Sequence, residues 1–240
     1  NGSFPDSAVA TMASIVANSE VGVNYFQVGL FIRDFTPRPM SQIEAMLCCV
    51  SKNAIDAGAG LIVLFSETGR APKLVAKYRP CVPVLVVTSS EAVYRHCNAH
   101  FSLHPRKVDA ALMSKSFDDA DTLALMEEIL SEAVTSGLWG SSKHVVVVRG
   151  LGKTASADDE PFLSFYKPKQ ASNKKLNRAA SSFFEYESKF ELYKTMSLRC
   201  TSISYNDVVS RYAPARKTKI VCTLGPSCWS EDMLGKLLDA

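Results

Sequence analysis

Short apolar runs, separated by polar turns, set the pattern of the chain between residues 61 and 149. Residues 61–65 read Leu-Ile-Val-Leu-Phe, a run too short for a typical helix and rich in β-branched and aromatic side chains. Residues 82–87 and 144–149 contain two further apolar runs. Such runs are typical of strands that are buried on both faces of a parallel sheet. The pattern therefore predicts a mainly parallel sheet.

Helical spacing of apolar residues precedes and separates these runs. It predicts helices from Asp6 or Ser7 to about residue 20, from Ser41 to Gly58, after Gly69, over 92–97 and from Ser116 or Asp118 to Gly137. The helix between runs 61–65 and 82–87 makes a crossover long enough for parallel, right-handed pairing. Two prolines at 37 and 39 predict an extended connection and a domain boundary. The expected fold class is α/β, with a doubly wound sheet.

The turn that follows the first apolar run carries the candidate chemistry. Residues 66–70 read Ser-Glu-Thr-Gly-Arg, and Pro72 falls in the first turn of the expected helix. Free backbone N–H groups at a helix start, two hydroxyls and an arginine suit a phosphate group. The alternative is that Ser66 or Thr68 only caps the helix.

The stretch 66–88, SETGRAPKLVAKYRPCVPVLVVT, closely resembles the allosteric C-terminal domain of the pyruvate kinase family. The resemblance implies that this loop, through Ser66, Thr68, Gly69 and Arg70, binds the phosphate of a sugar-phosphate effector. It implies a second contact from Lys153, because residues 150–154 resemble the loop that closes over the sugar; a plain turn is the alternative.

Glu67 departs from the family pattern, because many effector-responsive members carry a neutral residue there. A carboxylate about 4 Å from a phosphate would repel it by about 4 kcal/mol at an effective dielectric of about 20. If Glu67 turns away from the loop, a phosphate can still bind. If it points inward, binding should be feeble.

The two ends of the chain resemble pieces of the catalytic barrel of the same family. Residues 1–20 look like the last helix of a (β/α)8 barrel, and residues 219–226, Lys-Ile-Val-Cys-Thr-Leu-Gly-Pro, resemble its first strand. Thr223 and Pro226 match positions that the family places beside the nucleotide. The order is back to front, which predicts a fragment spanning the join of two tandem copies. Circular permutation and a mis-joined gene model are the alternatives.

These resemblances divide the chain into four parts. We expect a barrel helix and its connection in residues 1–36, the C-terminal α/β domain in 37–154, a linker in 155–196, and the start of a second barrel in 197–240. The linker rests on composition, because apolar periodicity is lost after residue 155 and residues 167–175 are basic and polar. A short helix is expected over residues 182–193.

The resemblance also implies an activity for the parent protein. Pyruvate kinases are transferases of glycolysis that move a phosphoryl group from phosphoenolpyruvate to ADP, giving pyruvate and ATP, with Mg2+ and usually K+. The family's acidic metal ligands, its enolate-stabilising lysine and its Asn-Phe-Ser-His segment have no match in residues 1–240, so we expect no catalytic or metal residue here and an inactive fragment. A homo-oligomeric, cytoplasmic enzyme is implied. The alternative is a non-catalytic anion-sensing or assembly module.

The composition argues against some classes of binding partner but identifies none. The formal net charge is +3, too weak a bias to indicate nucleic acid or membrane partners. The seven cysteines lack a CxxC spacing, which predicts reduced thiols, with Cys48 and Cys49 as packing residues.

His96, His100 and His104 recur every four residues, but Pro105 and an expected helix end near Asn98 argue against a shared metal-binding face. No apolar run is long enough for a membrane span, and the first residues lack a signal pattern, which suggests an internal fragment.

Overall fold

The computed structural model describes residues 3–116, 119–140, 144–152, 154–168 and 216–240. The chain divides into two compact units, one made of residues 24–200 and the other of residues 1–23 with 201–240. The predicted linker beyond residue 168, the expected helix over 182–193 and Lys153 lie outside the described residues.

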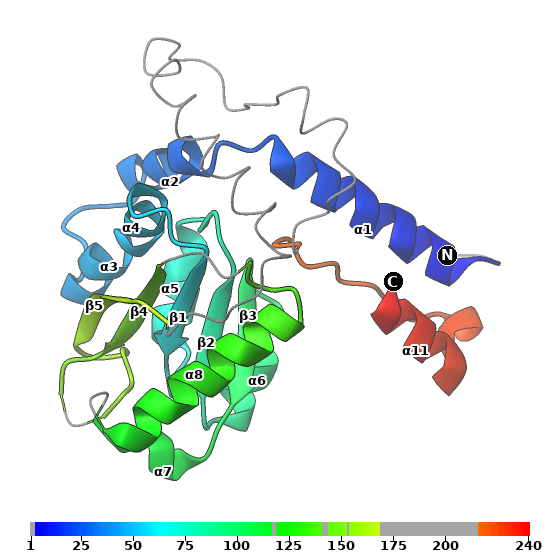
Figure 1. Cartoon of the computed structure of the whole chain (residues 1–240). Helices are drawn as coiled ribbons and strands as arrows, with labels where there is room; N and C mark the ends of the chain where they lie inside the picture. The colour runs from blue at the N-terminus through cyan, green and yellow to red at the C-terminus, as the bar shows by residue number, and fades with distance from the viewer. Residues whose placement is uncertain (1–2, 117–118, 141–143, 153, 169–215) are drawn as a thin grey trace. The chain divides into compact units, whose positions relative to one another are not determined.

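The larger unit is built on a five-stranded sheet with the order β3-β2-β1-β4-β5 (Figure 1). The strands are β1 (Leu61–Phe65), β2 (Val84–Thr88), β3 (Leu103–Lys107), β4 (Val145–Gly150) and β5 (Pro161–Tyr166). β1 pairs in parallel with β2 and β4, and β2 pairs in parallel with β3, whereas β5 is antiparallel to β4. The three apolar runs thus form the central strands, and the predicted mainly parallel α/β sheet is confirmed.

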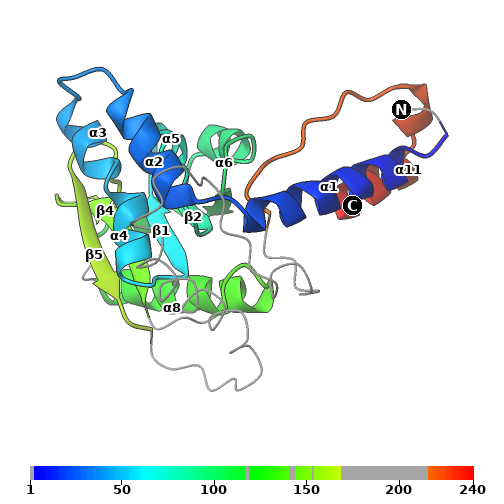
Figure 2. The ribbon, with the colours of Figure 1, turned by 90° about the horizontal axis from the view of Figure 1, so that it is seen from above.

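Helices cover both faces of this sheet, as Figure 2 shows. One face carries α3 (Gln42–Leu47), α4 (Val50–Asp56), α5 (Arg70–Lys77) and α6 (Glu91–Cys97), and the other carries α7 (Ala110–Met113) and α8 (Ala120–Thr135). A further helix, α2 (Tyr25–Asp34), packs near α4. The side chains of β1 alternate between two apolar clusters and are at most 1% exposed. Burial on both faces explains the unbroken apolar run.

The structure departs from the sequence-based elements in three places. The helix expected from Ser41 to Gly58 is split in two at Cys48 and Cys49, although Ser41 caps its start by accepting from Glu44 N–H at 3.2 Å. The edge strand β3, with the sequence Leu-His-Pro-Arg-Lys, lies outside the apolar runs from which the sheet was predicted. The sheet also continues beyond the predicted boundary at residue 154, because β5 lies inside the stretch expected to be linker. Its sequence, Pro-Phe-Leu-Ser-Phe-Tyr, is mostly apolar, but polar segments flank it and Phe162 and Phe165 are exposed.

The smaller unit contains α1 (Pro5–Val21), a 3₁₀ turn η1 (Pro226–Cys228) and α11 (Glu231–Asp239). The helix expected to end near residue 20 is α1, and Ser230 caps α11 by accepting from Met233 N–H at 3.3 Å. Residues 219–225, expected to be a barrel strand, form no strand in the described part of this unit, and Val221 is 87% exposed. A strand needs a hydrogen-bonded neighbour. None of the described helices has the length and apolarity needed to cross a bilayer.

Candidate functional site

The candidate site lies where the strand order reverses. The chain moves outward from β1 through β2 to β3 and then returns to place β4 on the other side of β1. In open α/β sheets, ligands bind outside the carboxyl ends of the strands at such a switch point. Two segments meet there: the turn of residues 66–69 after β1, and the segment after β4. We call this second segment, residues 150–152 and 154–158, the strap.

A carboxylate from the strap already occupies the hydrogen-bond donors of the turn. Asp158 is 3% exposed and lies at the start of α5. Its carboxylate accepts hydrogen bonds from Ser66 Oγ (2.9 and 3.0 Å), Glu67 N–H (2.8 Å), Thr68 N–H (2.8 Å), Ala71 N–H (3.0 Å) and Ser156 Oγ (2.8 Å). The turn therefore directs its N–H and hydroxyl donors at the protein's own carboxylate, and binding of an external phosphate stays a prediction.

Local conformation explains why the turn presents so many N–H groups. Gly69 has φ of 77°, a left-handed conformation that glycine adopts without strain, and it is the N-cap of α5. Gly69 has no side chain to cap the helix, and the Thr68 hydroxyl accepts only from Arg70 N–H, at 3.3 Å. Instead, Ser66 Oγ accepts from Gly69 N–H at 3.0 Å and donates to Asp158. The buried hydroxyl thus links the turn to the carboxylate.

The strap is held by main-chain contacts that are independent of Asp158. Ala157 N–H donates to the carbonyl of Phe65, the last residue of β1, at 2.8 Å, and Ala155 N–H donates to Met113 at 3.0 Å. Gly150 N–H donates back to Ala155 at 2.9 Å. A Cβ at Gly150 would lie 2.3 Å from the Ser156 carbonyl oxygen, so only glycine allows this close fold. The strap therefore delivers Asp158 to the turn in a fixed position.

Electrostatics favour the ionised form of Asp158. Burial raises the pKa of this carboxyl group, because it disfavours the charged form. The hydrogen bonds from the N–H groups of Ala71 and Thr68 and from the hydroxyls of Ser156 and Ser66 outweigh burial and lower the pKa of Asp158 below its ordinary value. The carboxylate also lies at the positive end of the α5 dipole. It is therefore a bound anion at neutral pH.

Glu67 turns away from the donors of the turn. Its Oε1 accepts from Ser89 N–H at 2.8 Å, and its Oε2 accepts from Ser89 Oγ at 2.6 Å. Its carboxylate is thus engaged at the end of β2, while its backbone N–H contributes to the turn. Of the two orientations open from the sequence, the structure shows the outward one.

The other residues expected at the effector site are placed less centrally. Thr68 and Arg70 are exposed at the rim, where Thr68 Oγ1 accepts from Arg70 N–H at 3.3 Å. Thr223 and Pro226, the nucleotide candidates, are exposed in the smaller unit. Sequence reasoning missed Asp158 and Ser156. The adjacent acids Asp158 and Asp159 gave a weak signal, but nothing in the sequence indicated that one of them returns to the turn.

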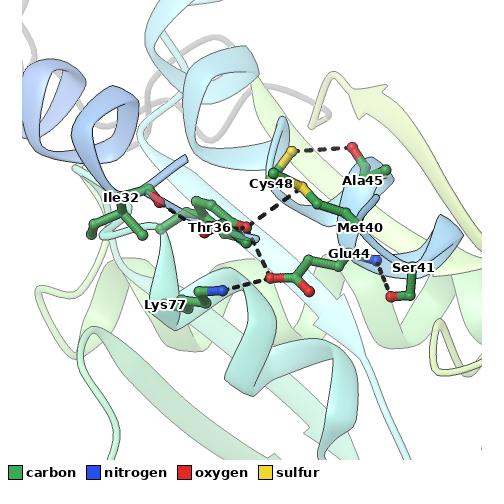
Figure 3. Close-up of polar contacts among 9 residues, drawn as sticks. Ile32, Thr36, Met40, Ser41, Glu44, Ala45, Cys48 and Lys77 are labelled. Atoms are coloured by element: carbon green, nitrogen blue, oxygen red, sulfur yellow. Dashed lines mark hydrogen bonds and ion pairs between the residues drawn. The ribbon is translucent and has the colours of Figure 1, made fainter. Parts of the chain in front are cut away.

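The opposite end of α5 carries the Lys-Tyr-Arg-Pro segment noted in the sequence, and Figure 3 shows its polar contacts. Glu44 Oε1 accepts from Lys77 Nζ at 2.7 Å and from Tyr78 Oη at 2.9 Å, joining α5 to α3. The ion pair with Lys77 is the main reason why the pKa of Glu44 is lowered. Arg79, with φ of 52°, stacks its guanidinium 4.7 Å from the Phe101 ring centre. This cluster anchors α5 and offers no reactive group.

The described residues do not fit the metal chemistry of a phosphotransferase. Across the described ranges, no three histidine, cysteine, aspartate or glutamate side chains gather in a group that could hold a metal ion. Asp158, the buried acid of the site, is surrounded by hydrogen-bond donors rather than by further carboxylates. Such surroundings favour an anion over Mg2+.

Comparisons with known proteins bear on the family and the fold of this chain. Residues 44–158 match a family model described as the pyruvate kinase alpha/beta domain. A cytosolic pyruvate kinase isozyme of Nicotiana tabacum is 33% identical over 168 residues, covering 65% of this chain and 32% of that protein. One of Solanum tuberosum is 30% identical over 167 residues, covering 64% and 32%.

A solved pyruvate kinase from Cryptosporidium parvum shares the fold, with a TM-score of 0.51 at 21% identity, covering 62% of this chain and 27% of that one. The chain thus spans about a third of the length of the curated relatives that it matches. The mainly parallel sheet agrees with these matches. Residues 44–158 therefore correspond to the C-terminal α/β domain of the pyruvate kinase family.

Proposed function

We propose that this chain is the regulatory part of a pyruvate kinase, in which the turn of residues 66–69 is the anion site through which the domain is controlled. The observation that carries the proposal is the set of donors converging at the switch point: N–H groups of Glu67, Thr68 and Ala71 with the Ser66 hydroxyl, all directed at one carboxylate. A phosphate group of a sugar-phosphate effector presents oxygens of the same kind. Arg70 at the rim and Lys153 would add positive charge.

The parent protein is proposed to transfer a phosphoryl group from phosphoenolpyruvate to ADP in the cytoplasm, as a homo-oligomer that uses Mg2+ and K+. Its relatives in Nicotiana tabacum and Solanum tuberosum are described as cytosolic pyruvate kinases, which supports this assignment. No chemical step is assigned to the described residues, because they contain no group suited to the metal. Thr223 and Pro226 remain candidates for contact with the nucleotide in a complete barrel.

A coupled lactate dehydrogenase assay tests this proposal. The purified 240-residue chain should show no Mg2+-dependent turnover, whereas a protein extended by a complete barrel should be active. Turnover by the 240-residue chain would refute the regulatory assignment. An extended protein that folds but stays inactive would favour the alternative, a non-catalytic anion-sensing or assembly module.

We also propose that the back-to-front order reflects two tandem copies joined after the sheet. Since β5 ends at Tyr166, the tether is proposed to follow residue 168 rather than residue 154. Limited proteolysis of the extended protein should cut first between residues 169 and 196, because nicking concentrates in exposed polar segments. First cleavage inside the α/β domain would count against this arrangement.

A further inference from the structure

We propose that Asp158 is a built-in anion that closes the turn of residues 66–69 against external phosphate, so that the domain is held in a self-liganded state. This inference rests on the proposed regulatory role of the turn and adds how that role is controlled. In the described structure, the N–H groups of Glu67, Thr68 and Ala71 that would bind a phosphate oxygen all donate to Asp158.

Three features make this contact a built arrangement and not an incidental one. Asp158 is 3% exposed, and the hydroxyl of Ser66 that it accepts from is fully buried. Its anchors on either side are fixed by main-chain hydrogen bonds, including Ala157 N–H to Phe65 O at 2.8 Å and Leu151 N–H to Glu160 O at 2.9 Å. The carboxylate also comes from 87 to 92 residues away in the sequence, so only the folded sheet brings it to the turn.

The N–H and hydroxyl groups that donate to Asp158 would still attract an anion if its carboxylate were removed. The groups around the carboxylate are neutral N–H and O–H donors at the start of α5, and Glu67 directs its own charge toward Ser89. Removing the Asp158 carboxylate would therefore leave a cluster of unsatisfied donors with no negative charge directed into it. Such a cluster at a helix start binds phosphate.

A tethered carboxylate competes strongly with a free anion. A group held by a short segment has an effective concentration in the millimolar range or higher. The apparent affinity for an external ligand falls in proportion to the fraction of molecules in which the site is open. If the turn is open in a tenth of the molecules or fewer, external phosphate should bind about tenfold or more weakly than to a turn without Asp158.

The test titrates inorganic phosphate into the purified 240-residue chain and its variants by calorimetry, with melting temperature as a second measurement. Wild type should bind phosphate weakly or not at all in the millimolar range. Asp158→Ala should bind at least about tenfold more tightly, and phosphate should raise its melting temperature. Asp159→Ala is the matched control, because it removes the same charge from an exposed neighbour and should behave as wild type.

A double variant, Asp158→Ala with Ser66→Ala, should lose most of the gained affinity, since the buried hydroxyl is one of the donors. Equal phosphate affinity in wild type and Asp158→Ala would overturn the proposal. So would the absence of binding in an Asp158→Ala chain that keeps the far-ultraviolet circular dichroism of the wild type.

Should Asp158→Ala not fold, Asp158→Asn keeps the shape and removes the charge, and it should respond to phosphate through its melting temperature; no response would count against the proposal. These outcomes are independent of the coupled enzyme assay. A pyruvate kinase assignment that fails there would leave the competition between Asp158 and phosphate standing.

Discussion

Each unit contains a buried carboxylate, and the negative charge is stabilised differently in the two. Asp158 binds N–H and hydroxyl donors at the beginning of α5, all of them neutral. Glu20, in the last turn of α1, accepts from Lys217 N–H at 2.9 and 3.1 Å and from Thr218 N–H at 2.6 Å, and the ammonium group of Lys217 lies 3.6 Å away. Both side chains of that ion pair are less than 10% exposed.

The end of the helix that each acid contacts explains the difference. The N-terminus of a helix carries partial positive charge and the C-terminus partial negative charge. Asp158 meets the favourable end of α5 and needs no cation. Glu20 lies near the unfavourable end of α1, where a buried cation from the same unit compensates it. The donors around Asp158 are all neutral, so another anion could bind them in its place.

The largest effect is expected when Glu20, the acid paired with Lys217, is neutralised. Glu20→Gln removes the carboxylate charge that is paired with the buried Lys217 ammonium, and breaking one side of a buried ion pair typically costs about 3–5 kcal/mol. We expect rapid hydrogen–deuterium exchange in the peptide that contains residues 216–224. Glu231→Gln, at an exposed position in the same unit, is the control and should leave this exchange unchanged. Slow exchange in the Glu20 variant would mean that the ion pair is dispensable.

A substitution in the strap should destabilise the protein nearly as much, because the path of the strap depends on Gly150. In Gly150→Ala, the new Cβ would lie 2.3 Å from Ser156 O and 2.6 Å from Thr154 O, both rigid main-chain atoms. Overpacking of this kind costs about 1–3 kcal/mol, and displacement of Asp158 would add to it.

Gly152→Ala is the matched control for this substitution, since nothing lies within 4 Å of its Cβ. Urea unfolding can be followed by the fluorescence of Trp139, which is buried in the α/β domain, in a Trp229→Phe background. The Gly152 variant should unfold within about 0.5 kcal/mol of the parent. Equal unfolding free energies for the two glycine variants would show that the strap can move at little cost.

A smaller loss is expected from the hydroxyl that links the turn to Asp158. Ser66→Ala removes a buried donor to the carboxylate and the acceptor of Gly69 N–H, and an unsatisfied buried group costs about 1–3 kcal/mol. Thr68→Ala is the control, because its exposed hydroxyl accepts only a 3.3 Å contact from Arg70 N–H. It should cost less than about 1 kcal/mol. The same urea measurement decides, and a larger loss for Thr68→Ala would place the important hydroxyl at the rim.

The sequence predicted the central strands better than it predicted which group binds the donors of the turn. Strand β1 and helix α5 follow from local signals: an apolar run, a glycine and a proline in the first helical turn. The partner of the turn comes from a segment of mixed polarity whose position depends on long-range strand pairing. β5 was missed because polar segments flank its short, mostly apolar run. The orientation of Glu67 likewise depends on Ser89, which no local pattern connects to it.

The smallest effect, and the sharpest test of the comparison, is the pH dependence of the Asp158 contact. Because its folded pKa is lowered, Asp158 stays ionised in the folded protein at a pH where it begins to protonate in the unfolded chain. The unfolded state then binds more protons, so the free energy of unfolding decreases as the pH falls. The stabilisation is complete at neutral pH and is lost from about the ordinary aspartate value of 3.8 downward, through the folded pKa.

Asp158→Asn lacks this titration, so its unfolding free energy should depend less on pH below 4 than that of the wild type. The two curves should lie furthest apart at neutral pH and converge in acid. Asp159→Asn, changed at the exposed neighbour, should follow the wild-type curve throughout. Urea unfolding of the three proteins between pH 3 and pH 7, read from Trp139, provides the comparison. A constant gap between wild type and Asp158→Asn across that range would mean that the donors of the turn bind the amide as they bind the charge, and that the turn does not select anions.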